Sequence, residues 1–512
     1  MQNERRSFLG GSNMGGRGGV VWPTVLGILL AVAGCGSSSD AADSGLAEFY
    51  DQAVQWGPCD GFHAQGKELS AAGLQCAGIT VPLDYEHPGR NTVRIGLSRL
   101  AARGDRLDAI LLQPGGPGES GLAMPLGYSE SVLGERFDLI GIDVRGLGSA
   151  QPKVECLTPD EALAARSADS ADYSQAGIER TEQRNREYVA KCVERSGVKL
   201  LSHVGTREVA RDLDVVRAVL RTEKLNMLGV SYGSRVGSTY AELFPDRVRA
   251  MVLDAAVNPE SSITDAEVFS VGFQRAFEAY AAECAKTAEC PLGSDPARAT
   301  STLHALIDPL IDRPAATTDP RGLGYMDALS AVLNSLYFPG WWPGLTEGLT
   351  ELRQGRGDAL LGRADFFATD IVDHNLQQAV FCLDEKRITT RAAAGEAVRR
   401  SLAVAPMLDD GRFTGTAPLD VCAFWPIAPT SQPHVPNVPG LPMVVVVATT
   451  GDPATPYEGG VVLARDLHAA LITREGNGHG GFNRGSACVD NAVLRYFVDL
   501  TPPAEGIRCT TP

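Results

Sequence analysis

The chain has 512 residues, of which 44% are hydrophobic and 21% charged. This composition is typical of a globular protein and excludes wholesale disorder, a collagen-like repeat and a coiled coil. Acidic residues number 62 and basic residues 46, so the net charge is −16. Because a nucleic-acid-binding surface is normally basic, we expect no nucleic-acid partner.

The first segment, residues 1–34, is predicted to be a lipoprotein signal peptide. Residues 19–34 form the only long apolar run, which is shorter than the roughly 20 residues of a membrane-spanning helix but typical of a signal-peptide core. The run closes with the tetrapeptide VAGC, which ends at Cys35 and resembles a bacterial lipobox. We therefore expect a lipid on Cys35, a tether and N-terminal extension over residues 35–70, and a protein anchored on the extracytoplasmic side of the cell membrane. The alternative is a buried helix followed by a free cysteine.

The export route stays open between two signals. Arg5 and Arg6 begin a stretch that resembles a twin-arginine signal, but a glycine-rich segment separates it from the apolar run. Translation from Met14 would remove that stretch and leave an ordinary lipoprotein signal.

The eleven cysteines agree with export. Without Cys35 ten remain, an even number that suits disulfides outside the cytosol. None has the C-x-x-C spacing of zinc or redox sites, and we expect no metal. Ten cysteines allow very many connectivities, and we favour pairing in sequence order. The predicted pairs are Cys59 with Cys76, Cys156 with Cys192, Cys284 with Cys290, Cys382 with Cys422, and Cys488 with Cys509.

The elements predicted first in the mature chain are a hairpin and a series of buried strands. Residues 73–99 alternate apolar and polar positions around the turn signal HPG, which predicts an antiparallel hairpin. Continuous apolar runs follow, and such runs are typical of parallel strands that are covered on both faces. They occupy residues 108–116, 137–146, 225–231, 249–257, 442–449 and 470–476. Residues 209–220 repeat apolar positions at helical spacing and predict an amphipathic helix.

Between residues 259 and 440 the alternation of strand and helix lapses. This stretch is mostly helical in pattern, with proline-rich joints, and ends in the proline-rich linker 426–440. We predict a large helical cap inserted into one α/β core, which is built from residues 71–258 and 441–512. Three separate domains in series are the alternative, but they would leave the last two apolar strands without a sheet to join.

The strongest chemical motif is G-x-S-x-G around Ser231, which lies between a predicted strand and a predicted helix. This context is that of a nucleophile elbow, in which small flanking residues permit a strained turn that exposes the serine hydroxyl. The alternative is a plain Gly/Ser turn. We predict that Ser231 is a catalytic nucleophile.

A serine nucleophile needs a base and an acid, which follow it in the order acid, then histidine, on this fold. Asp452 follows the apolar run 442–449, and His479 lies in the glycine-rich loop 476–481. We predict these two residues as the acid and the base, with Asp254 as the rival acid and a solvated loop histidine as the rival reading of His479. The same loop formally matches a dinucleotide fingerprint, but no βαβ unit follows it, so we expect no cofactor.

The loop QPGGPG after the strand of residues 108–116 predicts an oxyanion hole, because its glycines allow backbone N–H groups to approach a substrate. We assign one donor to Gly116, with Gly115 as a close alternative, and the other to the amide of Tyr232. A phosphate-binding loop is the alternative, but G-K-[ST] is absent.

Glu119, just beyond this loop, has two interpretations. A carboxylate near the nucleophile is a simple partner for the α-amine of a peptide substrate. The structural interpretation, which we rank first, is that Glu119 caps the helix that follows, because an acidic side chain is favoured near a helix N-terminus.

These motifs resemble a known family. The strings VPLDY, QPGGPGESG, LGVSYGSRVGSTYAELFPDRVRAMVLD, FTGTAPLDVCAFWP and GDPATPY are similar to the α/β-hydrolase peptidases of the tripeptidyl-aminopeptidase and prolyl-aminopeptidase group, including lipoprotein serine proteases of the cell envelope. The resemblance runs from about residue 55 to the C-terminus. It implies an α/β-hydrolase core, a helical cap and a triad of Ser231, Asp452 and His479. Pro114 replaces the histidine of prolyl aminopeptidases, so a strict preference for N-terminal proline is not implied.

Three functions are compatible with these residues. The first, which we favour, is a lipid-anchored serine peptidase that cleaves peptide bonds near a free N-terminus. The second is a carboxylesterase or lipase that uses the same triad on envelope esters, since ester and amide cleavage share a tetrahedral intermediate. The third is a binding lipoprotein without catalysis. The expected partners are therefore a peptide or ester substrate and the membrane.

Overall fold

The computed structural model describes residues 45–166, 168–369 and 373–510. The predicted signal peptide, the lipidation of Cys35 and the first part of the tether lie outside these residues. In the described ranges, every helix is either too short or too polar to cross a membrane.

A nine-stranded sheet in the order β1-β2-β4-β3-β5-β6-β7-β8-β9 forms the centre of the core. The strands are β1 Gln75–Pro82, β2 Thr92–Leu100, β3 Asp108–Gln113, β4 Phe137–Asp143, β5 Leu225–Val230, β6 Val248–Asp254, β7 Val445–Gly451, β8 Ala470–Asn477 and β9 Arg508–Thr510. β2 runs antiparallel to both neighbours, and all later neighbours are parallel. The predicted hairpin and the predicted parallel sheet are therefore confirmed.

Helices cover both faces of this sheet. Those of the core are α1 Ala47–Tyr50, α2 Gly66–Ala71, α3 Met124–Tyr128, α4 Val132–Arg136, α7 Thr206–Val219, α8 Tyr232–Leu243, α16 Tyr457–Asp466 and α17 Ala487–Asp499. One hydrophobic cluster packs α7, α8 and α16 against one face, and another packs α4 and α17 against the other. Because both faces are covered, β4 is buried at every position, as its continuous apolar run predicts.

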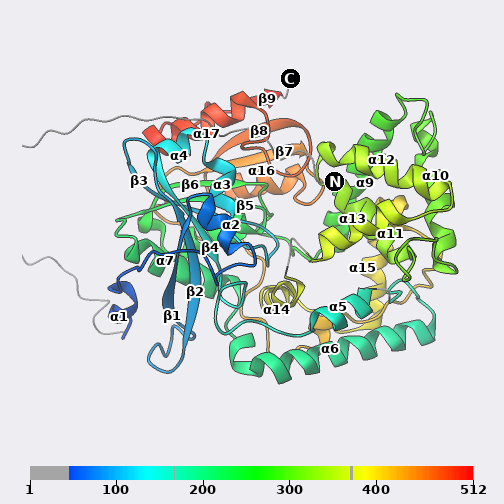
Figure 1. Cartoon of the computed structure of the whole chain (residues 1–512), viewed down its shortest axis with the longest axis horizontal. Helices are drawn as coiled ribbons and strands as arrows, with labels where there is room; N and C mark the ends of the chain where they lie inside the picture. The colour runs from blue at the N-terminus through cyan, green and yellow to red at the C-terminus, as the bar shows by residue number, and fades with distance from the viewer. Residues whose placement is uncertain (1–44, 167, 370–372, 511–512) are drawn as a thin grey trace, which may run out of the picture.

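The predicted helical segment after β6 forms a cap beside the sheet (Figure 1). Its helices are α9 Ala266–Cys284, α10 Ala299–Ile307, α11 Tyr325–Ser335, α12 Trp342–Arg353, α13 Asp358–Thr369, α14 His374–Asp384 and α15 Arg391–Val404. Helices α9 to α13 share a separate hydrophobic core. By contrast, the apolar side chains of α14 belong to the cluster of the sheet, so α14 connects cap and core.

A second segment, which the predicted division at residue 259 placed in the core, also contacts the cap, although Val189, Leu200 and Leu201 of this segment belong to the hydrophobic cluster of the sheet. Helices α5 (Pro159–Arg166) and α6 (Gln175–Leu201) follow β4 but lie along the cap (Figure 1). In α6, the amide of Asn185 donates to the carbonyl of Leu419 at 2.8 Å, and Glu182 accepts hydrogen bonds from Arg391 at 2.7 and 2.9 Å. No proline-rich linker marks this excursion, so the sequence pattern did not separate it from the core.

All five predicted disulfides are present. Cys156–Cys192 connects the chain after β4 to α6, and Cys488–Cys509 connects α17 to the short edge strand β9. Such cross-links stabilise a fold mainly by restricting the unfolded chain. β9 was not predicted, because three residues carry no periodicity.

Candidate active site

Ser231 lies at the turn between β5 and α8 with backbone angles φ 58° and ψ −123°. A residue with a side chain rarely adopts this conformation, and its cost is sustained only where the surroundings hold it. Here the N–H of Ser231 donates to the carbonyl of Asp254 at 2.9 Å. A side chain at Gly229 would place its Cβ 2.3 Å from the carbonyl oxygen of Gly233. The glycines of the motif are therefore required by the tight turn that presents the serine.

His479 lies in the loop after β8, and its Nδ1 faces the carboxylate of Asp452. The Nδ1–H donates to Asp452 at 2.9 and 3.1 Å to the two oxygens. Its backbone N–H donates to the carbonyl of Tyr337 in the cap at 2.8 Å, and the two rings meet edge to face with centroids 5.4 Å apart. With Nδ1 engaged, Nε2 is the nitrogen left to serve a nucleophile. Ser231 and His479 line the same cavity.

The carboxylate of Asp452, directly after β7, is 3% exposed at the residue level and is held by backbone donors. The N–H groups of Ala454, Thr455 and Gly480 donate to it at 3.0, 2.9 and 3.1 Å. Burial lowers the pKa of His479, but the charge and hydrogen bond of Asp452 outweigh it, so the net pKa is raised. The pair therefore favours the protonated imidazole that a general base must become.

Asp254, the rival acid, has a different place. Its carboxylate accepts from the N–H groups of Gly481 at 2.8 Å and Phe482 at 2.9 Å. Burial raises its pKa, and these two backbone donors partly oppose that shift. Among the described residues it accepts no hydrogen bond from His479. Asp254 therefore fixes the chain after His479, and Asp452 is the carboxylate on its ring.

The glycine loop after β3 places one free N–H group beside Ser231. Gly115 donates to an oxygen of Glu119 at 3.3 Å, whereas the N–H of Gly116 has no acceptor in the described part of the chain. The same holds for Tyr232, which opens α8, where the first amides of a helix have no internal partner. Gly116 and Tyr232 both border a cavity at Ser231. Of the two glycines considered for the oxyanion hole, this arrangement favours Gly116.

Glu119 does not cap a helix, so the interpretation ranked first is wrong. α3 begins only at Met124, after Ala123, and has no side-chain cap. The Glu119 carboxylate instead holds the Gly115 amide and lines a cavity with Ser231 and His479. Burial raises its pKa, while the charge of His479 acts in the opposite direction. Within the described ranges Glu119 forms no ion pair.

Two cavities meet at Ser231, and both are bordered by Gly116, Tyr337 and Gln377. The first, called the outer cavity, has a volume of about 690 Å³ and lies between the chain after β6, α9 and the start of α16. Its apolar lining includes Ile263, Val268, Phe269, Val271 and Phe381. The second, called the cap cavity, has a volume of about 430 Å³ and contains His479 and Glu119, opposite α11 and α13.

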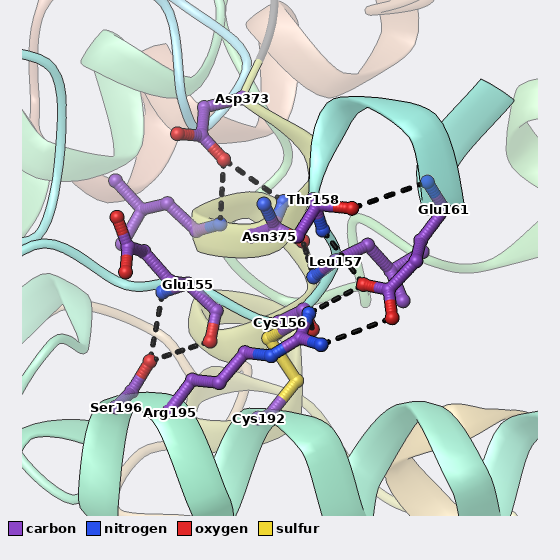
Figure 2. Close-up of a disulfide and its surroundings, with 11 residues drawn as sticks. Glu155, Cys156, Leu157, Thr158, Glu161, Cys192, Arg195, Ser196, Asp373 and Asn375 are labelled. Atoms are coloured by element: carbon purple, nitrogen blue, oxygen red, sulfur yellow. Dashed lines mark hydrogen bonds and ion pairs between the residues drawn. A yellow bond between two sulfur atoms is a disulfide. The ribbon is translucent and has the colours of Figure 1, made fainter.

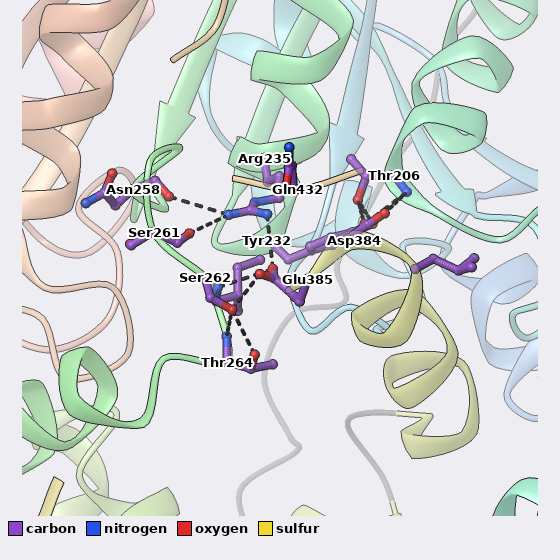
Figure 3. Close-up of polar contacts among 12 residues, drawn as sticks. Thr206, Tyr232, Arg235, Asn258, Ser261, Ser262, Thr264, Asp384, Glu385 and Gln432 are labelled. Atoms are coloured by element: carbon purple, nitrogen blue, oxygen red, sulfur yellow. Dashed lines mark hydrogen bonds and ion pairs between the residues drawn. The ribbon is translucent and has the colours of Figure 1, made fainter. Parts of the chain in front are cut away.

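A polar network that sequence analysis missed supports the outer cavity (Figure 3). Arg235, one turn beyond the nucleophile, donates to the carbonyl of Ser261 at 2.9 Å and to Glu385 at 3.1 Å. Glu385 accepts from the N–H of Ile263 at 3.2 Å. Beside them, burial raises the pKa of Asp384 to about 7. The network attaches the cavity wall to α8, the helix that follows Ser231. No sequence motif predicts this network, because its members come from three distant segments.

Metal-binding side chains form no candidate metal site in the part of the chain that the structure describes. No group of three or more histidine, cysteine, aspartate or glutamate side chains there is placed to bind an ion.

The sequence is similar to curated hydrolases along nearly its whole length. Residues 407–509 match the family described as "TAP-like protein". Serine protease Hip1 of Mycobacterium tuberculosis is 42% identical over 511 residues, covering 96% of this chain and 97% of the relative. Carboxylesterase B of the same organism is 42% identical over 466 residues, covering 89% of each chain. Tripeptidyl aminopeptidase of Streptomyces lividans is 31% identical, covering 85% of this chain and 83% of the relative.

Proposed function

The chain belongs to the α/β-hydrolase family of TAP-like serine hydrolases, and we propose that it cleaves peptides near a free N-terminus through an acyl-enzyme on Ser231. The serine hydrolase class follows from the relatives, whose names describe a protease, a carboxylesterase and an aminopeptidase. The preference for peptides with a free N-terminus goes beyond this class and is our proposal.

The proposed chemistry starts at the elbow. The Ser231 hydroxyl attacks the scissile carbonyl carbon and passes its proton to Nε2 of His479, while Asp452 stabilises the imidazolium that forms. The N–H groups of Gly116 and Tyr232 receive the oxyanion, helped by the positive N-terminus of α8. His479 then gives its proton to the leaving amine. Water, activated by the same histidine, releases the acyl group from Ser231.

The observation that carries the peptidase proposal is the carboxylate of Glu119. It has no ion-pair partner in the described ranges and lies in the cap cavity beside the nucleophile and the base. Burial of a carboxylate is costly without a compensating cation. The ammonium group of a peptide is such a cation. An ester substrate without charge offers Glu119 no comparable partner.

The proposal is tested with matched peptides that differ only in acetylation of the N-terminus. We expect kcat/KM to be higher for the free peptide by about tenfold or more, as the loss of a charged hydrogen bond typically gives. Labelling by a fluorophosphonate, present in the parent protein and absent in Ser231→Ala, verifies the nucleophile. Equal rates on both peptides would overturn the proposed preference without affecting the serine hydrolase class.

A carboxylesterase is the second candidate, and a separate observation favours it. The outer cavity, which Ser231 borders, has a largely apolar lining, and such a lining suits an acyl chain. Side-by-side kinetics on p-nitrophenyl esters of increasing acyl length and on the free peptides separate the two functions. A kcat/KM that rises steadily with the acyl length of the ester, together with slow peptide cleavage, would favour the esterase.

We also propose that Cys35 carries a lipid that anchors the enzyme on the extracytoplasmic side of the cell membrane. The VAGC tetrapeptide and the apolar run before it support this proposal, and two or more acyl chains anchor far more firmly than one. We expect the native protein to partition with membranes and Cys35→Ala to lack the lipid. An intact mass of the native protein without any lipid adduct would refute the anchor.

A further inference from the structure

A third cavity, here called the side cavity, lies between α5 and the start of α11, away from the triad. Its volume is about 510 Å³, and its walls include the apolar side chains of Leu163, Leu310 and Ile311. Arg166, Met326 and Asp327 line both the side cavity and the cap cavity. The two spaces are therefore neighbours that share one wall.

The shared wall is built around an arginine. Arg166, the last residue of α5, donates to Asp327 of α11 and to Asp365 of α13, each at 2.7 Å. The Arg166 side chain is 19% exposed, and those of Asp327 and Asp365 are 12% and 36% exposed. Ion pairs of such partly exposed groups contribute little net free energy. Moreover, α5 buries none of its residues, so the side chains of Arg166, Met326 and Asp327, not packed core, divide the cavities.

The other end of α5 is attached independently of Arg166 (Figure 2). Thr158 and Glu161 form a reciprocal capping box. The backbone N–H of Thr158 donates to the Glu161 carboxylate at 2.8 Å, and the backbone N–H of Glu161 donates to the Thr158 hydroxyl at 3.3 Å. Hydrogen bonds from Arg195 to Glu161 hold this turn on α6, next to the Cys156–Cys192 disulfide. A change at Arg166 therefore leaves the start of α5 in place.

The charges of the cap cavity indicate which part of a substrate enters it. Glu119 places on its wall a carboxylate that forms no ion pair within the described ranges, whereas Asp327 and Arg166 pair with each other. This environment is complementary to an ammonium group. On the proposed peptidase function, the N-terminal segment thus extends from Ser231 toward Arg166, and the departing chain occupies the outer cavity.

We propose that the side cavity is a latent extension of the peptide-binding site and that Arg166 limits the length of the N-terminal segment that the enzyme releases. A segment that fits within the cap cavity reaches Ser231 with its carbonyl. A longer one collides with Arg166 and Asp327, which line both cavities. This inference rests on the proposed peptidase function and deepens it, because it names the residue that sets the product length.

The test measures the length of the released products by mass spectrometry, with free peptides of identical sequence as substrates. Arg166→Ala is expected to release longer N-terminal segments than the parent, with kcat/KM for the extended cleavage higher by about tenfold, a typical value for relieved steric exclusion. Arg166→Lys retains a long cation and should keep the parent product length. Arg321→Ala removes a neighbouring ion pair to Asp365 without touching the cap cavity, so it should also leave the length unchanged.

A second variant verifies that the side cavity receives the added length. Leu163→Trp in the Arg166→Ala background fills that cavity and should restore the parent products. Leu107→Trp is the matched control, because Leu107 and Leu163 are both 42% exposed and Leu107 lies outside all three cavities. If Arg166→Ala does not fold, Met326→Ala opens the same wall and keeps both ion pairs. Unchanged product lengths in the folded variants would overturn the inference.

Peptide p-nitrophenyl esters of one to six residues separate this inference from the proposed function. The activated ester acylates Ser231 even if amide bonds are poor substrates. If the parent hydrolyses the esters but no peptides, the peptidase proposal fails, and the length profile of the esters still reports on the wall. If peptides are cleaved but Arg166→Ala and the parent show the same dependence of ester hydrolysis on length, the proposed role of Arg166 is refuted and the peptidase function stands.

Discussion

The substitution Glu119→Gln probes the proposed amine site with little change of shape. In the structure one carboxylate oxygen accepts the Gly115 amide at 3.3 Å, and a glutamine oxygen can accept the same bond. The side chain loses its negative charge, so its attraction for a substrate ammonium group is removed while its shape and its hydrogen bond with Gly115 are kept. Hydrogen bonds to charged groups contribute about 1.5–3 kcal/mol, which corresponds to a loss of roughly 10- to 150-fold in kcat/KM on free-amine peptides.

The same variant should move the pH profile in a defined direction. The charge of Glu119 contributes to the raised pKa of His479, and His479 must be neutral to act as the base. Removing the charge lowers that pKa, so the acidic limb of kcat/KM moves to lower pH on all substrates. The shift can be measured on N-acetylated peptides, which have no α-amine for Glu119 to bind.

The assay compares free peptides, acetylated peptides and a simple ester in the parent and in Glu119→Gln across pH. Glu458→Gln is the control, because Glu458 lines the outer cavity and is paired with Arg275 at 2.9 Å. We expect a selective loss on free peptides in Glu119→Gln alone. An equal loss on all three substrates, or a lower melting temperature without selective kinetics, would refute the role of Glu119 in amine binding.

Three further substitutions test the site. Gly115→Ala should abolish activity in a folded protein, measured by kcat and by circular dichroism, because the added Cβ would lie 2.8 Å from the Cβ of Ser231. Asp452→Asn should lower kcat by about 10⁴-fold, since the amide favours the wrong tautomer of His479. Asp254→Asn should instead lower the free energy of unfolding by about 1–3 kcal/mol through a lost backbone hydrogen bond, with a far smaller effect on kcat; the opposite ranking of the two variants would reverse their roles.

The sequence predicts those parts of the molecule whose signals are local. Continuous apolar runs identify β3 to β8, and the G-x-S-x-G turn places Ser231 where a strained φ of 58° is found. The loop of His479 is equally local, because glycines on both sides permit its backbone. Asp452 and Asp254 each end a strand, and only the fold decides which one faces the imidazole.

Other features depend on packing between distant segments, which leaves no pattern in the sequence. The hydrogen bonds from Arg166 to Asp327 and Asp365 each join positions more than 150 residues apart along the chain. The place of α6 along the cap depends on contacts with distant segments, such as the hydrogen bond from Asn185 to Leu419. Glu119 was expected at a helix start, but α3 begins five residues later, at Met124, and the carboxylate turns back to Gly115.

The covalent intermediate on Ser231 tests the proposed mechanism most directly. A tripeptide p-nitrophenyl ester with a free amine is mixed with the protein, the reaction is quenched with acid during turnover, and the modified peptide is identified by mass spectrometry. We predict the mass of the tripeptide acyl group on Ser231, and its loss in Ser231→Ala. An acyl group on another residue, or turnover without any adduct at Ser231 under conditions where deacylation limits the rate, would contradict the proposed mechanism.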